Sequence, residues 1–210
     1  MISYSRKFIF VHVPKTGGSA IEATLFPNLK PCVRRLYGGC NDKQRERYGI
    51  GLLQHLTADH IREEVGEDIF KSFFKFAVVR NPWDKLVSEY AYISNTSREK
   101  YIIKRLGLST AGVSFSEFAE AVCKSNFVNT HLFTQSLMVG DSLDFIGKFE
   151  NLQEDFNIVC DKIGIPRQEL PHKNKSQHKH YTEYYDDETR EIVAEKYSKD
   201  IECFGYEFGE

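Results

Sequence analysis

The chain has 210 residues, of which 41% are hydrophobic and 28% are charged, and its formal net charge is −2. This length favours one domain, whose core buries enough apolar surface to fold without a disulfide or a metal. The near balance of charge excludes the strongly basic composition of many nucleic-acid-binding proteins. We therefore expect no nucleic-acid partner, and any anion site has to be built locally.

The five cysteines show neither CxxC spacing nor the spacing of zinc ligands, so no metal site is expected. We expect reduced and mostly buried thiols, with a disulfide between Cys32 and Cys40 as the alternative. The N-terminal segment through Val13 has no signal-peptide cleavage site and is too short to span a bilayer. The sequence therefore predicts a cytoplasmic protein without a transmembrane segment.

Strand and helix signals alternate along the chain. In chain order, the pattern predicts a strand at 8–13, a helix at 20–25, a loop at 27–51, a helix at 57–65, a strand at 73–79, a helix from Pro82, helices near 98–106 and 114–124, a strand at 144–149, a helix at 152–163, a loop at 170–182 and a last amphipathic helix containing residues 185–193. This alternation implies a parallel sheet with helices on both faces. The predicted fold class is α/β, in one domain over residues 1–210.

The most informative motif lies between the first strand and the first helix, at residues 12–20, with the sequence HVPKTGGSA. Such a turn points backbone N–H groups at one spot on the positive end of the helix dipole. Gly17 and Gly18 allow close approach of a ligand, Lys15 adds a full charge, and Thr16 and Ser19 add hydroxyl donors. The motif suits a phosphate or a sulfate.

The nucleotide-triphosphate loop GxxxxGK[ST] does not fit this motif. The lysine precedes the glycine pair, and no Lys-Ser or Lys-Thr follows Gly18. The hydroxyl that normally holds Mg²⁺ is therefore not in its usual place.

A second motif follows the predicted strand at 73–79. Arg80 ends this strand at its carboxyl edge, where ligands bind in open α/β sheets, and its planar fork can bond two phosphate oxygens. Ser88 lies on the following helix, at the edge of its apolar stripe. The pair suits a second phosphate group.

Together the motifs resemble those of sulfotransferases that use 3′-phosphoadenosine 5′-phosphosulfate (PAPS). The sequence PKTGGS at 14–19 resembles their 5′-phosphosulfate loop, and Arg80 with Ser88 resembles their 3′-phosphate element. The sequence GKFENL at 147–152 is similar to a segment of the carbohydrate-type enzymes. The resemblance runs through essentially the whole chain and is closest to the family-2 group, although residues 27–51 match nothing in that pattern.

This resemblance implies a P-loop-NTPase-like sulfotransferase fold, PAPS as the donor with PAP as its product, and no metal. It implies that Lys15 stabilises the leaving phosphate and that residues 15–19, Arg80 and Ser88 bind the nucleotide. It also suggests that Lys173, Lys175 and Ser176, in a late basic loop, close over its phosphate; a solvated surface loop is the alternative. The implied acceptor is a hydroxyl, on a glycan or a small molecule, and nothing indicates the oligomeric state.

A base for the acceptor proton is expected between the two motifs, where family-2 sulfotransferases have a histidine. His55 precedes a predicted helix, and an imidazole suits proton removal near neutral pH. His60, Glu22 and Glu150 stay open as alternatives. His12 lies inside the predicted strand and is expected to be a core histidine.

Two other function classes remain open at this point. A nucleotide or small-molecule kinase would bind ATP with Mg²⁺, and a non-catalytic module would only hold PAP or a sulfated glycan. The lysine placement argues against the first, and the presence of both Lys15 and His55 argues against the second. A further basic cluster could steer an anionic acceptor, or is simply a charged surface loop: Arg34, Arg35, Lys43, Arg45 and Arg47.

Overall fold

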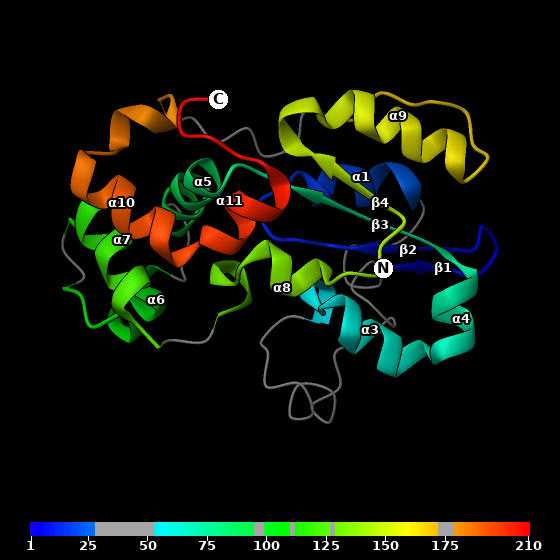
Figure 1. The fold of residues 1–210 in the computed structure, drawn as a ribbon, viewed down its shortest axis with the longest axis horizontal. Coiled ribbons are helices and arrows are strands. Elements are labelled where there is room, and N and C mark those ends of the chain that lie inside the picture. Colours follow the sequence, from blue (N-terminus) through cyan, green and yellow to red (C-terminus); the bar gives the residue numbers. More distant parts are fainter. Residues whose placement is uncertain (28–52, 95–98, 110–111, 127–128, 172–178) are drawn as a thin grey trace. The chain divides into compact units, whose positions relative to one another are not determined.

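The computed structural model describes residues 1–27, 53–94, 99–109, 112–126, 129–171 and 179–210 (Figure 1). The chain forms two compact units. The sheet unit comprises Met1–Val79 and Gln135–Lys173, and the helical unit comprises Arg80–Thr134 and Asn174–Glu210. The described residues form a mixed α/β structure, as the alternation of strand and helix signals in the sequence predicts. The single domain over residues 1–210 stays a prediction.

The sheet has four strands in the order β1-β2-β3-β4. Their bounds are β1 Ile2–Ser3, β2 Phe8–Val11, β3 Phe74–Val79 and β4 Phe145–Lys148. The last three run parallel and confirm the three predicted strands, each slightly shorter than predicted. The strand β1 pairs antiparallel with β2 and was not predicted, because two residues are too few to show a period.

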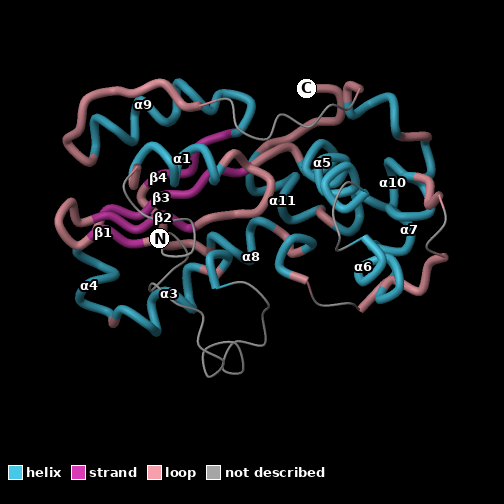
Figure 2. The backbone as a smooth tube through the Cα atoms, turned by 180° about the vertical axis from the view of Figure 1, so that it is seen from behind, coloured by secondary structure: helices cyan, strands magenta, loops and turns pink. Residues whose placement is uncertain are grey.

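Helices flank both faces of this sheet, as Figures 1 and 2 show from opposite sides. The helices α1 and α9 lie over one face, and α3, α4 and α8 lie under the other. Their bounds are α1 Gly18–Leu25, α3 Ala58–Val65, α4 Glu67–Ser72, α8 Gln135–Val139 and α9 Leu152–Lys162, with short 3-10 helices η2 at Leu53–His55 and η4 at Phe149–Asn151. All four residues of β2 are buried as a result. A strand covered on both faces reads as a continuous apolar run, which is why β2 was recognisable.

Alternate residues of β2 build an aromatic stack on one face of the sheet. Phe8, Phe10 and His12 follow one another at two-residue spacing and therefore point to the same side. The ring of Phe10 stacks on Phe76 of β3, with centroids 4.9 Å apart, and on the imidazole of His12 at 5.5 Å. The strand pattern thus continues one residue past β2 and delivers His12 to the end of the stack.

The helical unit is built on one apolar core. Its elements are α5 Pro82–Ser94, α6 Glu99–Arg105, α7 Phe115–Lys124, η3 Thr130–Leu132, η5 Tyr181–Tyr184, α10 Asp187–Lys196 and α11 Ser198–Phe204. Fully buried side chains such as Phe118, Val87 and Val193 come from α5, α7 and α10. The predicted helices from Pro82, near 98–106 and at 114–124 are confirmed. The helix predicted to contain residues 185–193 is α10, but it begins at Asp187 and is not the last one, because α11 follows it. The helices α4, α8 and α11 were not predicted, since each has at most seven residues and little room for a helical period.

Side-chain caps set the starts of several helices. Thr57 accepts the N–H of His60 at the start of α3. Ser114 with Glu117, and Asp186 with Thr189, form reciprocal capping boxes on α7 and α10. At α5, Asn81 accepts the N–H of Trp83 ahead of Pro82. Local sequence therefore decides where these helices begin.

Some predictions fall on parts of the chain that the structure does not describe. The predicted loop at 27–51, with its basic cluster and both Cys32 and Cys40, lies almost wholly outside the described residues, as do positions 172–178 of the predicted loop at 170–182. Cys123, Cys160 and Cys203 carry free thiols. Burial raises the pKa of Cys123 to about 11, which keeps this thiol protonated and poorly nucleophilic. Of the helices in the described ranges, none is both long and apolar enough to cross a membrane.

An ion pair between a buried lysine of β3 and a solvent-exposed aspartate joins β3 to the residue before β4. The ammonium of Lys75, with only 7% of its side chain exposed, lies 2.7 Å from Asp144 Oδ2 and 2.9 Å from the carbonyl of Phe73. Asp144 Oδ2 also accepts the backbone N–H of Lys75 at 2.7 Å. One carboxylate thus satisfies both a buried charge and a backbone donor.

We expect Asp144→Ala to lower the free energy of unfolding by about 1–3 kcal/mol, because it removes the counter-charge of the buried Lys75 ammonium, although solvent at the 46% exposed Asp144 side chain screens part of the interaction. Adding Lys75→Met to this variant should recover part of the lost free energy of unfolding, because it removes the unpaired charge of the Lys75 ammonium. Glu67→Ala, which breaks the exposed pair with Lys71, should cost less than about 1 kcal/mol. Urea denaturation followed by circular dichroism measures all three. Equal losses in the single and double variants would contradict this reading.

Candidate active site

The loop between β2 and α1, residues 12–19, has the backbone of an anion-binding turn. Lys15 has φ +67° and Gly17 has φ +80°, both in the left-handed region. Left-handed residues in a turn gather successive N–H groups into a concave nest. In the described part of the chain, the N–H groups of Gly17, Gly18 and Ser19 make no hydrogen bond. The loop therefore presents backbone donors at the N-terminus of α1.

Lys15 is notable because a side chain there resists the left-handed conformation. Non-glycine residues adopt it at a cost of about 1 kcal/mol or more and concentrate at functional sites. The Lys15 side chain is half-buried and that of Ser19 is exposed. Both are placed where a bound anion could use them.

Thr16 has a different role from the one predicted for its hydroxyl. Its side chain is fully buried, and its hydroxyl donates to the carbonyl of Val13 at 2.9 Å. This bond closes the turn from inside. The side chain of Thr16 is thus committed to the loop itself.

The two glycines are required by internal packing as well as by access for a ligand. A Cβ on Gly17 would lie 2.6 Å from Leu152 Cδ2, and a Cβ on Gly18 would lie 2.2 Å from His12 Nε2. The loop backbone therefore rests directly on α9 at one point and on the His12 imidazole at the other. No other residue fits either position without moving a neighbour.

His12 is buried, with 4% of its surface exposed, and is held on several sides. Its Nδ1 lies 2.7 Å from Glu22 Oε1 on α1, its ring stacks on Phe10, and Gly18 covers its other nitrogen. The expectation of a partnered core histidine thus agrees with its surroundings. Its partner is Glu22, which was considered among the alternative bases.

His55 reaches this loop from 43 residues away in the sequence. It ends η2, is 3% exposed, and its Nδ1 lies 2.9 Å from the backbone carbonyl of His12. Since a carbonyl only accepts, Nδ1 carries the proton, and Nε2 is the basic nitrogen of the neutral ring. The side-chain amide nitrogen of Gln54 lies 3.1 Å from that Nε2 and donates to it.

The remaining alternative bases lie elsewhere. His60 is half-buried in the first turn of α3, where its N–H donates to Thr57. Glu150 is exposed in η4, directly after β4. Of the candidate bases, Glu22 and His55 are joined through His12.

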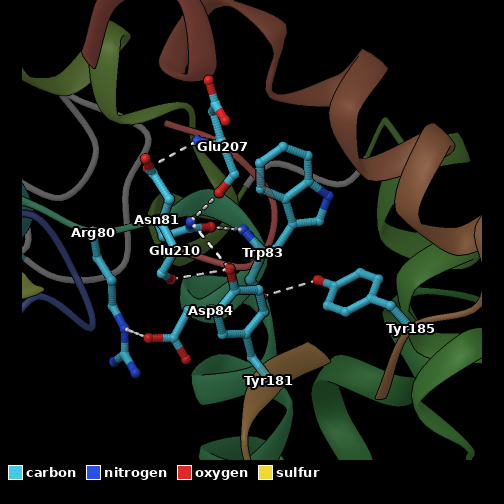
Figure 3. Close-up of polar contacts among 8 residues, drawn as sticks. All are labelled: Arg80, Asn81, Trp83, Asp84, Tyr181, Tyr185, Glu207 and Glu210. Carbon is cyan, nitrogen blue, oxygen red and sulfur yellow. Dashed lines mark hydrogen bonds and ion pairs between the residues drawn. The ribbon is translucent and has the colours of Figure 1, made fainter. Parts of the chain in front are cut away.

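In the helical unit, Arg80 is held by the helix it precedes (Figure 3). It is the residue after β3 in the chain, and its Nε donates to Asp84 Oδ2 at 2.7 Å. Only 8% of the Arg80 side chain and 18% of the Asp84 side chain are exposed. The carboxylate fixes the direction of the guanidinium fork.

Ser88 lies one helical turn beyond Asp84 on α5, so the two residues share a face of the helix. It is buried, with 3% exposed, and its hydroxyl makes no hydrogen bond among the residues that the structure describes. Arg80, Asp84 and Ser88 thus follow one another at four-residue spacing.

The turn after Arg80 is tied to the C-terminal segment, as Figure 3 shows. The Asn81 side chain donates to the carbonyl of Glu207 at 2.9 Å and lies 3.4 Å from the hydroxyl of Tyr181. That hydroxyl accepts the N–H of Gly209 at 2.6 Å. Asn81, 1% exposed, therefore links the start of α5 to the last residues of the chain.

Several residues around His55 in the sheet unit and around Arg80 in the helical unit carry roles that the sequence did not indicate. Asp84 could have been found, because an Asp four residues after an Arg at a helix start is a recognisable pair. Gln54 and Asn81 carry no such signal, since their partners are distant in the sequence or depend on side-chain direction. The predicted residues Lys173, Lys175 and Ser176 lie outside the described residues.

Comparisons with known proteins were made for the whole chain. A family model described as the sulfotransferase family matches residues 1–207. An uncharacterised protein of Archaeoglobus fulgidus is 33% identical over 109 residues, which are 51% of this chain and 82% of that protein. Carbohydrate sulfotransferase 14 of Danio rerio is 23% identical over 98% of this chain, and that of Mus musculus is 27% identical over 79%. The matches span 61% and 46% of those two proteins. No solved structure matches significantly.

We expect Gly18→Ala to destabilise the protein by about 1–3 kcal/mol, because the new methyl group overlaps the His12 imidazole, which Glu22 and Phe10 hold in place. Thermal and urea unfolding would measure the loss. A reference variant is Gly164→Ala just after α9, where φ is +70° and no atom lies within 4 Å of the added carbon. It measures the strain of a left-handed alanine, which Gly18→Ala does not add, so the loss in Gly18→Ala reports the overlap with His12 alone. An unchanged stability of Gly18→Ala would show that His12 is not fixed against the loop.

Proposed function

Since the chain belongs to the sulfotransferase family, we propose that it transfers the sulfuryl group of PAPS to an acceptor hydroxyl. The single observation that carries the mechanism is the hydrogen bond between His55 Nδ1 and the backbone carbonyl of His12, at 2.9 Å. It anchors the His55 imidazole at the start of the anion-binding loop. The proposed base and a nest of backbone donors are thus parts of one local structure.

The loop residues would hold the 5′ end of the donor. The N–H groups of Gly17, Gly18 and Ser19, together with the Ser19 hydroxyl, suit the oxygens of a phosphate at a helix N-terminus. Lys15 adds a full positive charge beside them. Thr16 acts through its bond to Val13, which holds the turn closed.

Arg80 and Ser88 would hold the 3′-phosphate. An arginine can bond two phosphate oxygens at once, and Asp84 pre-orders it by binding its Nε. This second phosphate distinguishes PAPS from ATP. Lys173, Lys175 and Ser176 complete the proposed nucleotide-binding set.

The transfer step follows from these roles. The acceptor oxygen attacks the sulfur in line with the bond between the sulfur and the bridging oxygen, which breaks as the new sulfur–oxygen bond forms. The acceptor hydroxyl has to replace the Gln54 amide at His55 Nε2, which then takes the hydroxyl proton, and the Lys15 ammonium neutralises the charge that develops on the bridging oxygen. The products are a sulfate ester, PAP and a protonated His55, which returns its proton to solvent. The protein contributes position and charge, as in phosphoryl transfer.

We propose a carbohydrate hydroxyl as the acceptor. Support comes from the two relatives named carbohydrate sulfotransferase 14, which align with most of this chain. A cytoplasmic location stays a prediction from the sequence.

Calorimetric titration is expected to show metal-independent binding of PAP and no binding of ATP with Mg²⁺. Arg80→Ala should weaken PAP binding by about tenfold to a hundredfold, because a charge-assisted bond to phosphate contributes roughly 1.5–3 kcal/mol. Its matched control is Arg167→Ala, which removes an exposed arginine paired with Asp161 after α9 and should leave PAP binding unchanged. Binding of ATP with Mg²⁺ but not PAP would favour a kinase and overturn the proposal.

Lys15→Ala is expected to reduce kcat by about a hundredfold or more, since it removes a charge aimed at the leaving oxygen in the transition state. The readout is transfer of radiolabelled sulfate from PAPS to a panel of glycan acceptors. Lys124→Ala serves as control, because that lysine forms an exposed pair with Glu120 on α7. Normal turnover in Lys15→Ala would exclude this role for Lys15, and PAP binding without transfer in the wild type would favour a non-catalytic binding module.

A further inference from the structure

We propose that Glu22 and His12 form a positioning pair that holds the proposed base, His55, with Nε2 as its proton-accepting atom. This inference rests on the proposed function for its catalytic meaning, but its structural content can be tested without turnover. The pair does not touch the reacting atoms in this scheme. It acts through His55 and through the loop backbone.

The contact between Glu22 and His12 determines which nitrogen of His12 carries a proton. Glu22 Oε1 lies 2.7 Å from His12 Nδ1, and the two side chains are only 10% and 4% exposed. A carboxylate accepts hydrogen bonds and cannot donate one, so Nδ1 is protonated whether the ring is neutral or charged. The carboxylate therefore locks the orientation of the His12 ring.

The other contacts of His12 leave its ring little freedom. One face stacks on Phe10, with an interplanar angle of 18°, and the backbone of Gly18 lies against Nε2 and its neighbouring carbons. A rotation of the imidazole would collide with the loop on one side and lose the Phe10 stack on the other. Glu22 supplies the polar contact that selects one orientation.

His12 passes this constraint to His55 in two ways. Its backbone carbonyl accepts the Nδ1 proton of His55 at 2.9 Å, and its ring packs edge-to-face with His55, with centroids 4.7 Å apart at 75°. The carbonyl selects the tautomer of His55, and the ring sets its plane. A base that can rotate or change tautomer presents its lone pair to the acceptor for only part of the time.

The same residue supports the anion-binding loop. His12 precedes Lys15 by three positions, and Gly18 has room for its backbone only because it lacks a Cβ beside the imidazole. The His12 side chain thereby sets the position of both the His55 imidazole and the loop backbone. This explains why a buried carboxylate is placed on α1 at a position where an apolar residue would otherwise pack.

The test is Glu22→Gln, which keeps the shape of the side chain and removes its charge. An amide can donate or accept, so it no longer forces the proton onto His12 Nδ1. We expect long-range proton–nitrogen NMR spectra of histidine-labelled protein to show one tautomer for His12 and for His55 in the wild type. In Glu22→Gln, a second tautomer should appear at His12 and the His55 signals should shift or double.

In kinetics, Glu22→Gln should lower kcat by about tenfold while changing the dissociation constant of PAP by less than about threefold, because the base is displaced but the loop donors remain. Glu22→Leu should cost more, so that the glutamine variant counts as a partial rescue. A merely structural role would lower the unfolding temperature and leave both the kcat of the folded protein and the His55 spectrum unchanged.

The matched control is Glu89→Gln in the helical unit. Glu89 is 1% exposed and lies 2.9 Å from Nδ1 of His131, so the substitution removes the same kind of buried pair. It should alter the His131 signals and leave those of His12 and His55 as they are. Unchanged His55 signals and unchanged kcat in Glu22→Gln would overturn the inference. A wild type that neither binds PAP nor transfers sulfate would instead overturn the proposed function, while the tautomer result would still stand.

Discussion

The hydrogen bond from His55 to the carbonyl of His12 is the contact on which the candidate site depends. It joins a 3-10 helix to the end of a central strand, across 43 residues of chain. Because both partners are buried, competition from water does not weaken the bond. The consequence is local: the residue that ends the aromatic stack of β2 also begins the anion-binding loop and selects the tautomer of His55. Sheet packing, loop shape and proposed chemistry therefore share one residue.

Gly17 and Gly18 meet two separate requirements of the loop, the close approach of an anion and the packing of the loop backbone. Close approach of an anion needs a backbone without side chains, and so does the packing of that backbone on Leu152 and His12. The packing requirement cannot be read from the sequence. Leu152 lies far from Gly17 in the chain, and the sequence does not show that the His12 side chain turns toward Gly18. The loop backbone is thereby packed against both Leu152 and His12. Preorganised donors stabilise developing charge better than donors that must first be ordered.

In the helical unit, buried polar side chains fix the position of the turn that follows Arg80. Asn81 joins the start of α5 to the C-terminal segment, and Asp84 aims Arg80, while the hydroxyl of Tyr185 donates to the carbonyl of Trp83 at 2.9 Å. Burial raises the pKa of Tyr185 well above its usual value, so this hydroxyl stays a neutral donor. The apolar core made by α5, α7 and α10 holds these groups in place. Each of these hydrogen bonds would have to break for the turn after Arg80 to move, which would leave a buried polar group without a partner.

The sequence by itself determined the three parallel strands, the principal helices, the loop at 12–19 and the family, because these depend on local period, caps and short motifs. Short motifs also led to Lys15, Arg80 and Ser88 as ligands of the nucleotide, and the family resemblance led to His55 as the base; these roles stay predictions. Tertiary structure alone decided that Thr16 closes the turn, that Gly18 packs on His12, and that Glu22 pairs with His12. It also revealed Asn81 as a link to the C-terminal segment. These contacts join residues whose separation in the chain carries no periodic signal, and they depend on the direction of each side chain, which only the packed backbone fixes.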